Sequence, residues 1–334
     1  MGSPLVSVIL PYYNAGKALA LAINSLLNQT FSDFELILVN NNSIDSSIDV
    51  AKRFAASDPR IRLMQEPQQG VVFAANTGML KANGKYIARM DADDVAHPER
   101  LKLQFDHLES NLDISISATQ VKYKTENESL KDFSHFVDWS NSLTSWEDIQ
   151  QNLFVEFPVI NPTLMFRRSM LREIGDLKDG HFPEDYEWFL RAIEIGHKVE
   201  KLPIPLLDWQ DSETRLTRTD SRYESDAFFQ IKTEYLAKRL KTIDQTRVWI
   251  WGAGRLGYKR SQLLLNEGIE IAGYIDIKKE KQLTDYPCIH FEEIDRNLQP
   301  YIISYISNRG KREEVRSFLN AKGYHEGVNY IIAG

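Results

Sequence analysis

Short apolar segments alternate with helix-like patterns along the first 125 residues of this 334-residue chain. Apolar runs of this kind predict buried strands, whereas longer amphipathic stretches predict helices. Strict alternation is typical of βαβ units, in which parallel strands form one sheet with helices on its faces. The expected strands are 6–10, 34–39, 60–64 and 85–88, and the expected helices are about 15–28, 46–56 and 70–82. The sequence therefore predicts an α/β fold with a mostly parallel central sheet.

Polar residues follow three of the expected strands. They form the segments Pro11–Asn14, Asn40–Ser43 and Asp91–Asp94. Ligands of open α/β sheets bind outside the carboxyl ends of the strands, which meet at one edge. We therefore expect the three segments to converge on one crevice.

The third segment places the carboxylates of Asp91, Asp93 and Asp94 within four positions. Three carboxylates repel one another unless a cation or solvent screens them. Mg²⁺-like ions prefer one or two carboxylates together with phosphate oxygens and waters, so the cluster predicts a metal–phosphate site. The alternative is a solvated turn whose acids favour the start of the helix expected at Pro98-Glu99.

Composition excludes several other classes of protein. With 43% hydrophobic and 26% charged residues the chain is typical of a globular protein. Its net charge of −7 argues against a nucleic-acid partner. The single cysteine, Cys288, excludes an intrachain disulfide and favours a reducing compartment. Without a spanning segment or a leader-like N-terminus, we expect a cytoplasmic protein, with peripheral contact at the inner face of the membrane left open.

The pattern changes after residue 125. Residues 126–160 are polar and aromatic and are expected to form a long functional loop. A strand near 162–166 and a helix near 169–174 follow, and a loop then delivers Glu184-Asp185 to a helix over 186–195. A charged helical stretch, about 221–241, is expected to be a linker. We therefore expect two domains, 1–241 and 242–334, the first able to fold and bind its ligand alone.

Several segments together carry a family resemblance. They are Val6–Asn14, Ala22–Thr30, Phe34–Ser43, Gly70–Gly78, Gly84–Asp94 with Pro98–Leu101, and Pro183–Tyr186. Over roughly residues 4–240 the chain resembles the family-2 inverting glycosyltransferases with the GT-A fold. The resemblance implies a transferase that moves a sugar from a nucleotide-sugar donor, a UDP-sugar first, to a hydroxyl of a glycan or lipid-linked acceptor. It also implies a part in bacterial surface polysaccharide synthesis.

The resemblance also implies roles for individual residues. The implied donor-binding residues are Pro11, Tyr13, Asn14, Asn41, Asn76, Asp91 and Asp93. The acidic cluster matches the Asp-x-Asp element, in which Asp93, with Asp94 as a second candidate, would ligate Mn²⁺ or Mg²⁺. Two positions depart from the family pattern: Asn41 stands where relatives usually carry aspartate, and Ala75 where they often carry arginine.

Glu184 and Asp185 match the acidic pair that supplies the general base in this family. Asp185 is the expected base, taking the proton of the acceptor hydroxyl, and Glu184 is expected to bind acceptor hydroxyls. The structural alternative is that both acids complement the dipole of the first helical turn. The processive-synthase Gln-x-x-Arg-Trp motif is absent, which favours an enzyme that adds one sugar.

A second glycine-rich pattern lies near the C-terminus. The expected strand Arg247–Trp251 runs into Gly252, Gly254 and Gly257 and a helix, and the next strand ends at Asp276. This context predicts a small Rossmann-like domain, half of a doubly wound fold at best, with a nucleotide site at those residues. The alternative is that the glycines serve only the turn and helix packing.

Three other functions stay open from the sequence. A sugar-1-phosphate nucleotidyltransferase would need a glycine-rich basic loop where Pro11–Asn14 stands. An NAD(P)-linked oxidoreductase using Gly252–Gly257 would lack a substrate domain. A non-catalytic sugar-nucleotide binding protein is favoured only by Asn41 and Ala75. The donor base, the sugar, the acceptor, the linkage and the formation of a homo-oligomer are not predicted.

Overall fold

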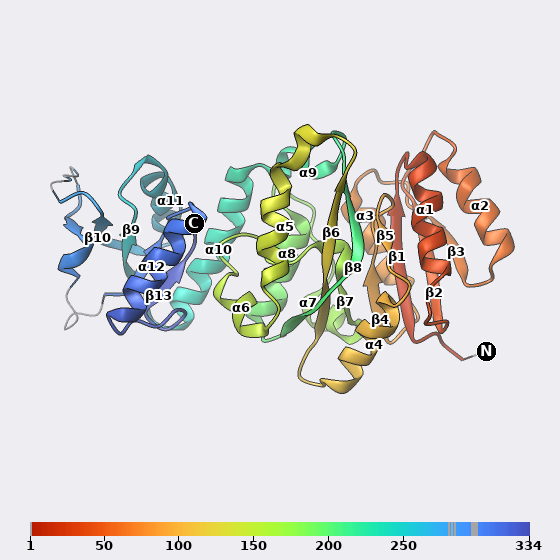
Figure 1. The fold of residues 1–334 in the computed structure, drawn as a ribbon, viewed down its shortest axis with the longest axis horizontal. Coiled ribbons are helices and arrows are strands. Elements are labelled where there is room, and N and C mark those ends of the chain that lie inside the picture. Colours follow the sequence, from red (N-terminus) through yellow and green to blue (C-terminus); the bar gives the residue numbers. More distant parts are fainter. Residues whose placement is uncertain (1, 280, 282, 284, 295–299) are drawn as a thin grey trace. The chain divides into compact units, whose positions relative to one another are not determined.

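The computed structural model describes residues 2–279, 281, 283, 285–294 and 300–334. Contacts within the chain divide it into two compact units (Figure 1). The first comprises residues 1–146 and 159–223, and the second comprises 147–158 and 224–334. The α/β class expected from the sequence is confirmed.

The first unit contains an eight-stranded sheet in the order β3-β2-β1-β4-β7-β6-β8-β5. Its strands are β1 (Val6–Tyr12), β2 (Phe34–Asn40), β3 (Ile61–Gln65), β4 (Tyr86–Arg89), β5 (Val95–Ala96), β6 (Ile116–Thr125), β7 (Met165–Arg167) and β8 (Val199–Asp211). The first four strands are parallel, as predicted. β7 is antiparallel to both β4 and β6, and β5 is antiparallel to β8. The sheet is therefore mixed beyond β4.

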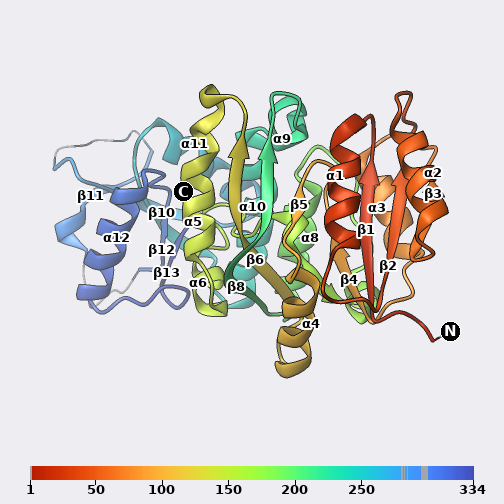
Figure 2. The ribbon, with the colours of Figure 1, turned by 45° about the vertical axis from the view of Figure 1, so that its right-hand side comes forward.

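Helices cover both faces of this sheet. They are α1 (Gly16–Leu27), α2 (Ser47–Ser57), α3 (Val71–Leu80), α4 (Arg100–Ser110), α5 (Ser134–Ser142), α7 (Leu171–Ile174), α8 (Glu184–Glu194) and α9 (Leu216–Thr219). Side chains point alternately to the two faces of a strand. In β1, Val8 belongs to the core that includes α1 and α2, whereas Ile9 contacts Gly78 of α3. Figure 2 shows α1 and α3 on opposite sides of β1.

Two local expectations were wrong. β1 continues through Pro11 to Tyr12, because its pairing with β4 ends at Ile9 and Pro11 lies past the last residue pair on that side. Residues 126–160 are not a long loop, because they form a 3₁₀ turn (Glu128–Phe133), α5 and α6 (Trp146–Gln151). Phe133 of the 3₁₀ turn and Phe136 of α5 pack on Trp209 of β8. This packing accounts for the aromatic residues in the segment 126–160.

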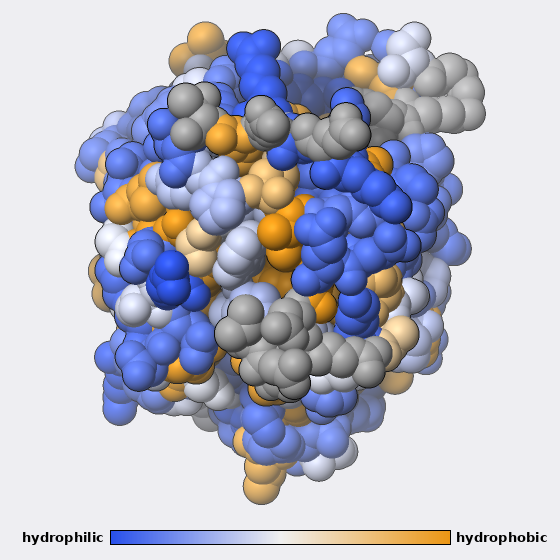
Figure 3. All heavy atoms as spheres, turned by 90° about the vertical axis from the view of Figure 1, so that its left-hand side faces the viewer, coloured by the Kyte–Doolittle hydropathy of each residue, from blue (hydrophilic) through white to orange (hydrophobic). Residues whose placement is uncertain are grey.

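The second unit is built on a fully parallel sheet in the order β11-β10-β9-β12-β13. Its strands are β9 (Arg247–Trp251), β10 (Glu270–Asp276), β11 (Cys288–His290), β12 (Ile302–Ser304) and β13 (Tyr330–Ile332). Its helices are α6, α10 (Ser225–Thr242), α11 (Arg255–Asn266) and α12 (Arg309–Ala321). Five strands in this order make a doubly wound sheet, more than the half predicted, because β11 was not foreseen. The face of this unit in Figure 3 carries hydrophobic side chains between hydrophilic ones.

The helix expected to be a linker, α10, groups with the second unit rather than with the first. Residues 147–158, from the middle of the chain, group with the second unit as well. Lys232 of α10 donates from Nζ to the carbonyl oxygen of Val155 at 3.0 Å. Contacts thus divide the chain at residues other than the expected 241/242 boundary, while independent folding of 1–241 stays a prediction. None of the helices formed by the described residues is long and apolar enough to cross a bilayer.

Candidate functional site

The acidic cluster lies just past the end of β4, as predicted from the strand pattern. The carboxylate oxygens that Asp91, Asp93 and Asp94 can offer to a metal lie within 4.8 Å of one another. Asp94 is fully buried, and its Oδ1 accepts the backbone N–H of Gln210 at 2.8 Å. Its Oδ2 has no hydrogen-bond partner among the described residues. A buried oxygen without a donor, beside two more carboxylates, fits the ligand set of a hard divalent cation.

The pKa values of two carboxyl groups in this cluster are raised. Burial, together with the charges of Asp93 and Asp91, raises the pKa of Asp94 well above its usual range, although Arg215 opposes the shift. Burial also raises the pKa of Asp93, again against the effect of Arg215. Asp93 and Asp94 therefore cannot both be ionised at low cost without further positive charge nearby.

Arg215 supplies part of that positive charge. Its Nη2 lies 3.4 Å from Asp91 Oδ2, and its Nη1 lies 3.8 Å from Asp93 Oδ2. The guanidinium stacks on Trp209, 4.3 Å from the ring centroid. Burial would lower the pKa of Arg215, but the nearby carboxylates outweigh it and raise that pKa. Arg215 therefore stays charged at the mouth of the cluster.

The second acidic pair stands at the first turn of α8. Tyr223 donates its hydroxyl to Glu184, with both carboxylate oxygens at 2.9 Å, so Glu184 is held in one orientation. Asp185 is partly exposed, and its Oδ1 accepts the N–H of Tyr186 at 2.8 Å. Burial of the carboxyl, followed by the charge of Glu184, raises the pKa of Asp185 to about 8. A carboxylate of that basicity is suited to accept a proton near neutral pH.

Arg89, the last residue of β4, connects the two acidic groups. It is 4% exposed, and its Nε and Nη1 have no hydrogen-bond partner among the described residues. Burial lowers its pKa, whereas the charges of Asp91, Glu184 and Asp185 raise it. Its charge thus interacts with both acidic groups. Arg89 was not among the predicted site residues, although an arginine that ends an apolar strand two residues before Asp91 was a usable sign.

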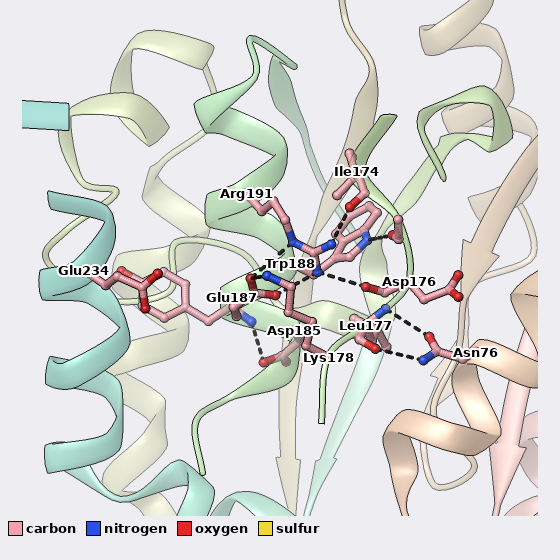
Figure 4. Close-up of polar contacts among 12 residues, drawn as sticks. Asn76, Ile174, Asp176, Leu177, Lys178, Asp185, Glu187, Trp188, Arg191 and Glu234 are labelled. Carbon is pink, nitrogen blue, oxygen red and sulfur yellow. Dashed lines mark hydrogen bonds and ion pairs between the residues drawn. The ribbon is translucent and has the colours of Figure 1, made fainter. Parts of the chain in front are cut away.

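Two of the expected donor-binding residues have their side-chain amides occupied. Asn41 is buried, donates to the carbonyl oxygens of Glu66 and Gln68, and accepts the N–H of Gly70 at 2.8 Å. Asn76 exchanges hydrogen bonds of 2.8 and 3.0 Å with the backbone of Leu177 (Figure 4). Both residues hold loops in place, so their donor contacts stay a prediction.

The loop that precedes α8 is further held by the helix itself. Trp188 donates from Nε1 to the carbonyl oxygen of Gly175, and Arg191 donates to that of Asp176 (Figure 4). Glu187 accepts from Arg191 and from Lys178. These contacts fix the segment that leads to Asp185.

The remaining first-strand residues lie at the same edge of the sheet. Asn14 adopts a positive φ of 48°, and its Oδ1 accepts the N–H of Ile44 at 2.9 Å, which joins two strand-end loops. Tyr13 is 52% exposed, so its ring is accessible for stacking, and Pro11 is partly buried.

The glycine-rich turn of the second unit has a structural explanation. Gly252 has a φ of 113°, and a Cβ on Gly257 would lie 1.8 Å from the carbonyl oxygen of Gly252, so both positions require glycine. A Cβ on Gly254 would meet nothing within 4 Å. Asp276 is paired with Lys281, whose Nζ lies 3.0 Å from its Oδ2. A nucleotide site at these residues stays a prediction.

Residues 7–175 match the family model described as Glycosyl transferase family 2. The chain is 31% identical over 246 residues to an uncharacterized glycosyltransferase of Haemophilus influenzae, covering 72% of this chain and 76% of the relative. It is 28% identical over 244 residues to the O-antigen biosynthesis glycosyltransferase WbnJ of Escherichia coli, covering 71% and 91%.

Solved structures share the fold at low sequence identity. S. aureus TarS residues 1–349, in complex with UDP-GlcNAc, superposes with a TM-score of 0.54 at 17% identity, covering 71% of this chain and 73% of that one. The mannosyltransferase PcManGT from Pyrobaculum calidifontis, in complex with GDP-Man and Mn²⁺, gives 0.51 at 17% identity, covering 80% and 70%.

Proposed function

The chain belongs to glycosyl transferase family 2 and has the GT-A fold; from this we propose that it is a metal-dependent, inverting enzyme. Its donor is a nucleoside-diphosphate sugar, with a UDP-sugar favoured. Its acceptor is a hydroxyl of a glycan or lipid-linked glycan in bacterial surface polysaccharide synthesis. The proposal is supported by the acidic cluster of Asp91, Asp93 and Asp94, and by buried Arg89, whose charge is favoured by both Asp91 and Asp185.

Metal dependence is supported by the buried Asp94 Oδ2, which lacks a donor among the described residues, and by the adjacent carboxylates. Asp93 and Asp94 would hold Mn²⁺ or Mg²⁺. A divalent ion bound there would supply Lewis-acid stabilisation of the charge that develops on the diphosphate leaving group. Arg215, within 4 Å of Asp91 and Asp93, is placed to add positive charge to the same phosphates.

Asp185 is the general base of the proposal. It accepts the proton of the acceptor hydroxyl while that oxygen bonds to the anomeric carbon and the bond from this carbon to the diphosphate oxygen breaks. Attack from the face opposite the leaving group inverts the anomeric centre. Its pKa of about 8 gives the carboxylate the required basicity. Glu184 is an unfavourable base because it is 3% exposed and hydrogen-bonded to Tyr223.

The donor and the pathway are supported more indirectly. The exposed ring of Tyr13 offers a stacking face to a nucleobase. TarS was solved with UDP-GlcNAc and PcManGT with GDP-Man, so neighbours of this fold differ in the base they bind. WbnJ acts in O-antigen biosynthesis, which favours a surface polysaccharide as the product.

The proposal is tested by the thermal stability of wild type and Asp93→Asn with UDP-, GDP-, CDP- and dTDP-sugars, with and without Mn²⁺. We expect one donor series to raise the Tm of wild type only when Mn²⁺ is present, and to leave Asp93→Asn unchanged. Asp106→Asn, an exposed change on α4, is the control for loss of a carboxylate. An equal Mn²⁺-dependent rise in Asp93→Asn would contradict the metal assignment.

Donor hydrolysis and transfer assays then separate an enzyme from a sugar-nucleotide binding protein. A wild-type protein that is stabilised by a donor and Mn²⁺, yet never releases nucleoside diphosphate with any acceptor, would favour the binding protein.

A further inference from the structure

A cavity of about 240 Å³ in the first unit is lined by four cationic side chains and one hydroxyl. The lining residues are Lys85, Arg167, Arg168, Ser169 and Arg172. Lys85 precedes β4, whose other end leads to Asp91. At about 3.3 Å per residue, the cavity lies roughly 20 Å along the chain direction from the acidic cluster. It is therefore separate from the proposed transfer site.

Strand register brings these cations together. β4 and β7 are antiparallel with Tyr86 opposite Arg167, so Lys85 and Arg168 are neighbours across the two strands. The N–H of Arg168 donates to the carbonyl oxygen of Lys85 at 2.9 Å, and its Nε donates to that of Gly84 at 2.6 Å. A second 3₁₀ turn, Arg168–Met170, and the start of α7 then bring Arg172 to the same cavity.

The cationic charge of this cavity is poorly compensated. Arg167 donates to the carbonyl oxygens of Leu108 and Ile114 and to the hydroxyl of Tyr86, which are all neutral acceptors. Glu109 pairs with Lys85.

Arg168 and Arg172 make no ion pair with any described residue. Four cations thus surround the cavity with one carboxylate paired among them, on a chain whose net charge is −7. Such a local excess favours the binding of an anion.

Phosphate is the anion that this geometry suits. Guanidinium groups bind phosphate oxygens with paired, charge-assisted hydrogen bonds, and a serine hydroxyl adds one more donor. The volume is below the roughly 300–1,000 Å³ of pockets that enclose whole drug-sized ligands. We propose that this cavity binds a phosphate group, carried either by a small soluble molecule or by the headgroup of an anionic lipid.

The two sources differ in what else they would contact. Leu80, at the end of α3, and Leu112, in the turn before β6, are 77% and 80% exposed. Arg167 donates to the carbonyl oxygen of Asn111, the residue before Leu112, at 3.3 Å. α3 leads into β4, and β6 begins beside β7 (Ile116 opposite Phe166), so both leucines lie at the sheet edge that carries the cavity. A lipid headgroup would bring them to the apolar part of a membrane surface, whereas a soluble phosphate would not use them.

The test uses the full chain and three double variants. Arg168→Gln/Arg172→Gln removes two charges from the cavity. Lys52→Gln/Arg53→Gln removes the same charge from the exposed face of α2 and is the matched control. Leu80→Ser/Leu112→Ser tests the apolar contact. Binding is measured by calorimetric titration with inorganic phosphate and glycerol 3-phosphate, and by co-sedimentation with phosphatidylcholine vesicles with or without phosphatidylglycerol.

For a soluble ligand, we expect saturable binding that weakens about tenfold or more in the cavity variant and is unchanged in the leucine and α2 variants. For a lipid headgroup, we expect sedimentation only with phosphatidylglycerol, lost in both the cavity and the leucine variants and kept in the α2 variant. Binding to neither probe, or equal losses in the cavity and α2 variants, would overturn the proposal. Arg172→Gln alone, at an exposed position, repeats the test if the double variant fails to fold.

Discussion

Burying a guanidinium without hydrogen bonds is unfavourable, yet Arg89 is 4% exposed and two of its nitrogens lack partners among the described residues. The compensation comes from charge at longer range, because Asp91, Glu184 and Asp185 all favour the cationic form. The relation is reciprocal, and Arg89 lowers the pKa of Asp185 against the larger effects of burial and Glu184. Arg89 is thus a positioning residue for the base, acting through charge.

Replacing Arg89 with methionine should therefore raise the pKa of Asp185 further. The base must be deprotonated to act, so activity should be lost at low pH and the rising limb of the pH–rate profile should move to higher pH. A rise of one pH unit in that pKa lowers the ionised fraction at pH 7 about tenfold. Profiles of kcat/KM for wild type, Arg89→Met and Arg89→Lys test this, with Lys expected to restore the limb in part. An unchanged limb in Arg89→Met would contradict the role.

Asp185→Asn should abolish proton acceptance while leaving the donor site intact. We expect sugar transfer to fall by roughly 10²-fold or more, the usual scale for a missing general base. The wild-type rate should rise with pH up to about 8, since the raised pKa keeps Asp185 protonated below that value. Donor binding measured by Tm should be unchanged. Near-wild-type turnover in Asp185→Asn would assign the base to another group.

At the scale of elements, the sequence predicted best where burial is greatest. β2 is buried along its whole length and was predicted to within one residue, because a strand buried on both faces is mostly apolar. β9 matches the expected strand at both ends, although its first residue, Arg247, is exposed. α5 was missed because its packing side chains are aromatic and lie among polar ones. β11 was missed because a strand of three residues is too short to show an alternating hydrophobic pattern.

The candidate site was predictable in part for a different reason. Strand ends and acidic residues are visible in the sequence, so Asp91, Asp93 and Asp94 could be placed at a strand end, whereas Asp185 was named only through the family resemblance. Partners distant in the chain are not visible. The bonds of Asn76 to Leu177 and of Glu184 to Tyr223 span 101 and 39 residues, and they depend on tertiary packing alone.

The packing of α3 on β1 depends on Gly78. A Cβ there would lie 2.3 Å from Cγ2 of Ile9, so Gly78→Ala should force α3 away from the strand that carries Pro11–Asn14. We expect a loss of about 1–3 kcal/mol in the free energy of unfolding, the range for overpacking. Urea unfolding of the full chain measures this. Gly254→Ala, where a Cβ meets nothing within 4 Å, is the control, and equal losses in both variants would contradict the packing account.

At the scale of the whole molecule, the polypeptide enters the second unit twice. It does so at residues 147–158 and again from residue 224 onward. Within that unit Arg316 of α12 donates from Nη2 to Oδ1 of Asn152 at 2.9 Å, and Lys232 bonds the backbone of Val155. Leu153 and Phe154 are each 3% exposed. The early segment is therefore an integral part of the later unit.

We therefore expect a fragment of residues 1–241 to be less stable as a monomer than an independently folding domain would be. It keeps α10 and residues 147–158 but lacks the sheet of the second unit, so it should expose apolar surface. We expect it to bind a hydrophobic dye more strongly than the full chain and to associate in size-exclusion chromatography. A fragment that is monomeric and binds the dye no more strongly than the full chain would support the predicted boundary between residues 241 and 242.

The double entry into the second unit also has a consequence for synthesis on the ribosome. Residues 147–158 are made before any other part of that unit, and 158 further residues are added up to Arg316, the partner of Asn152. At typical rates of 5–20 residues per second this takes about 8–32 s. During that time the first unit can fold while residues 147–158 still lack their later-made partners in the second unit. Leu153 and Phe154, which are buried in the folded chain, are therefore made well before most of the unit to which they belong.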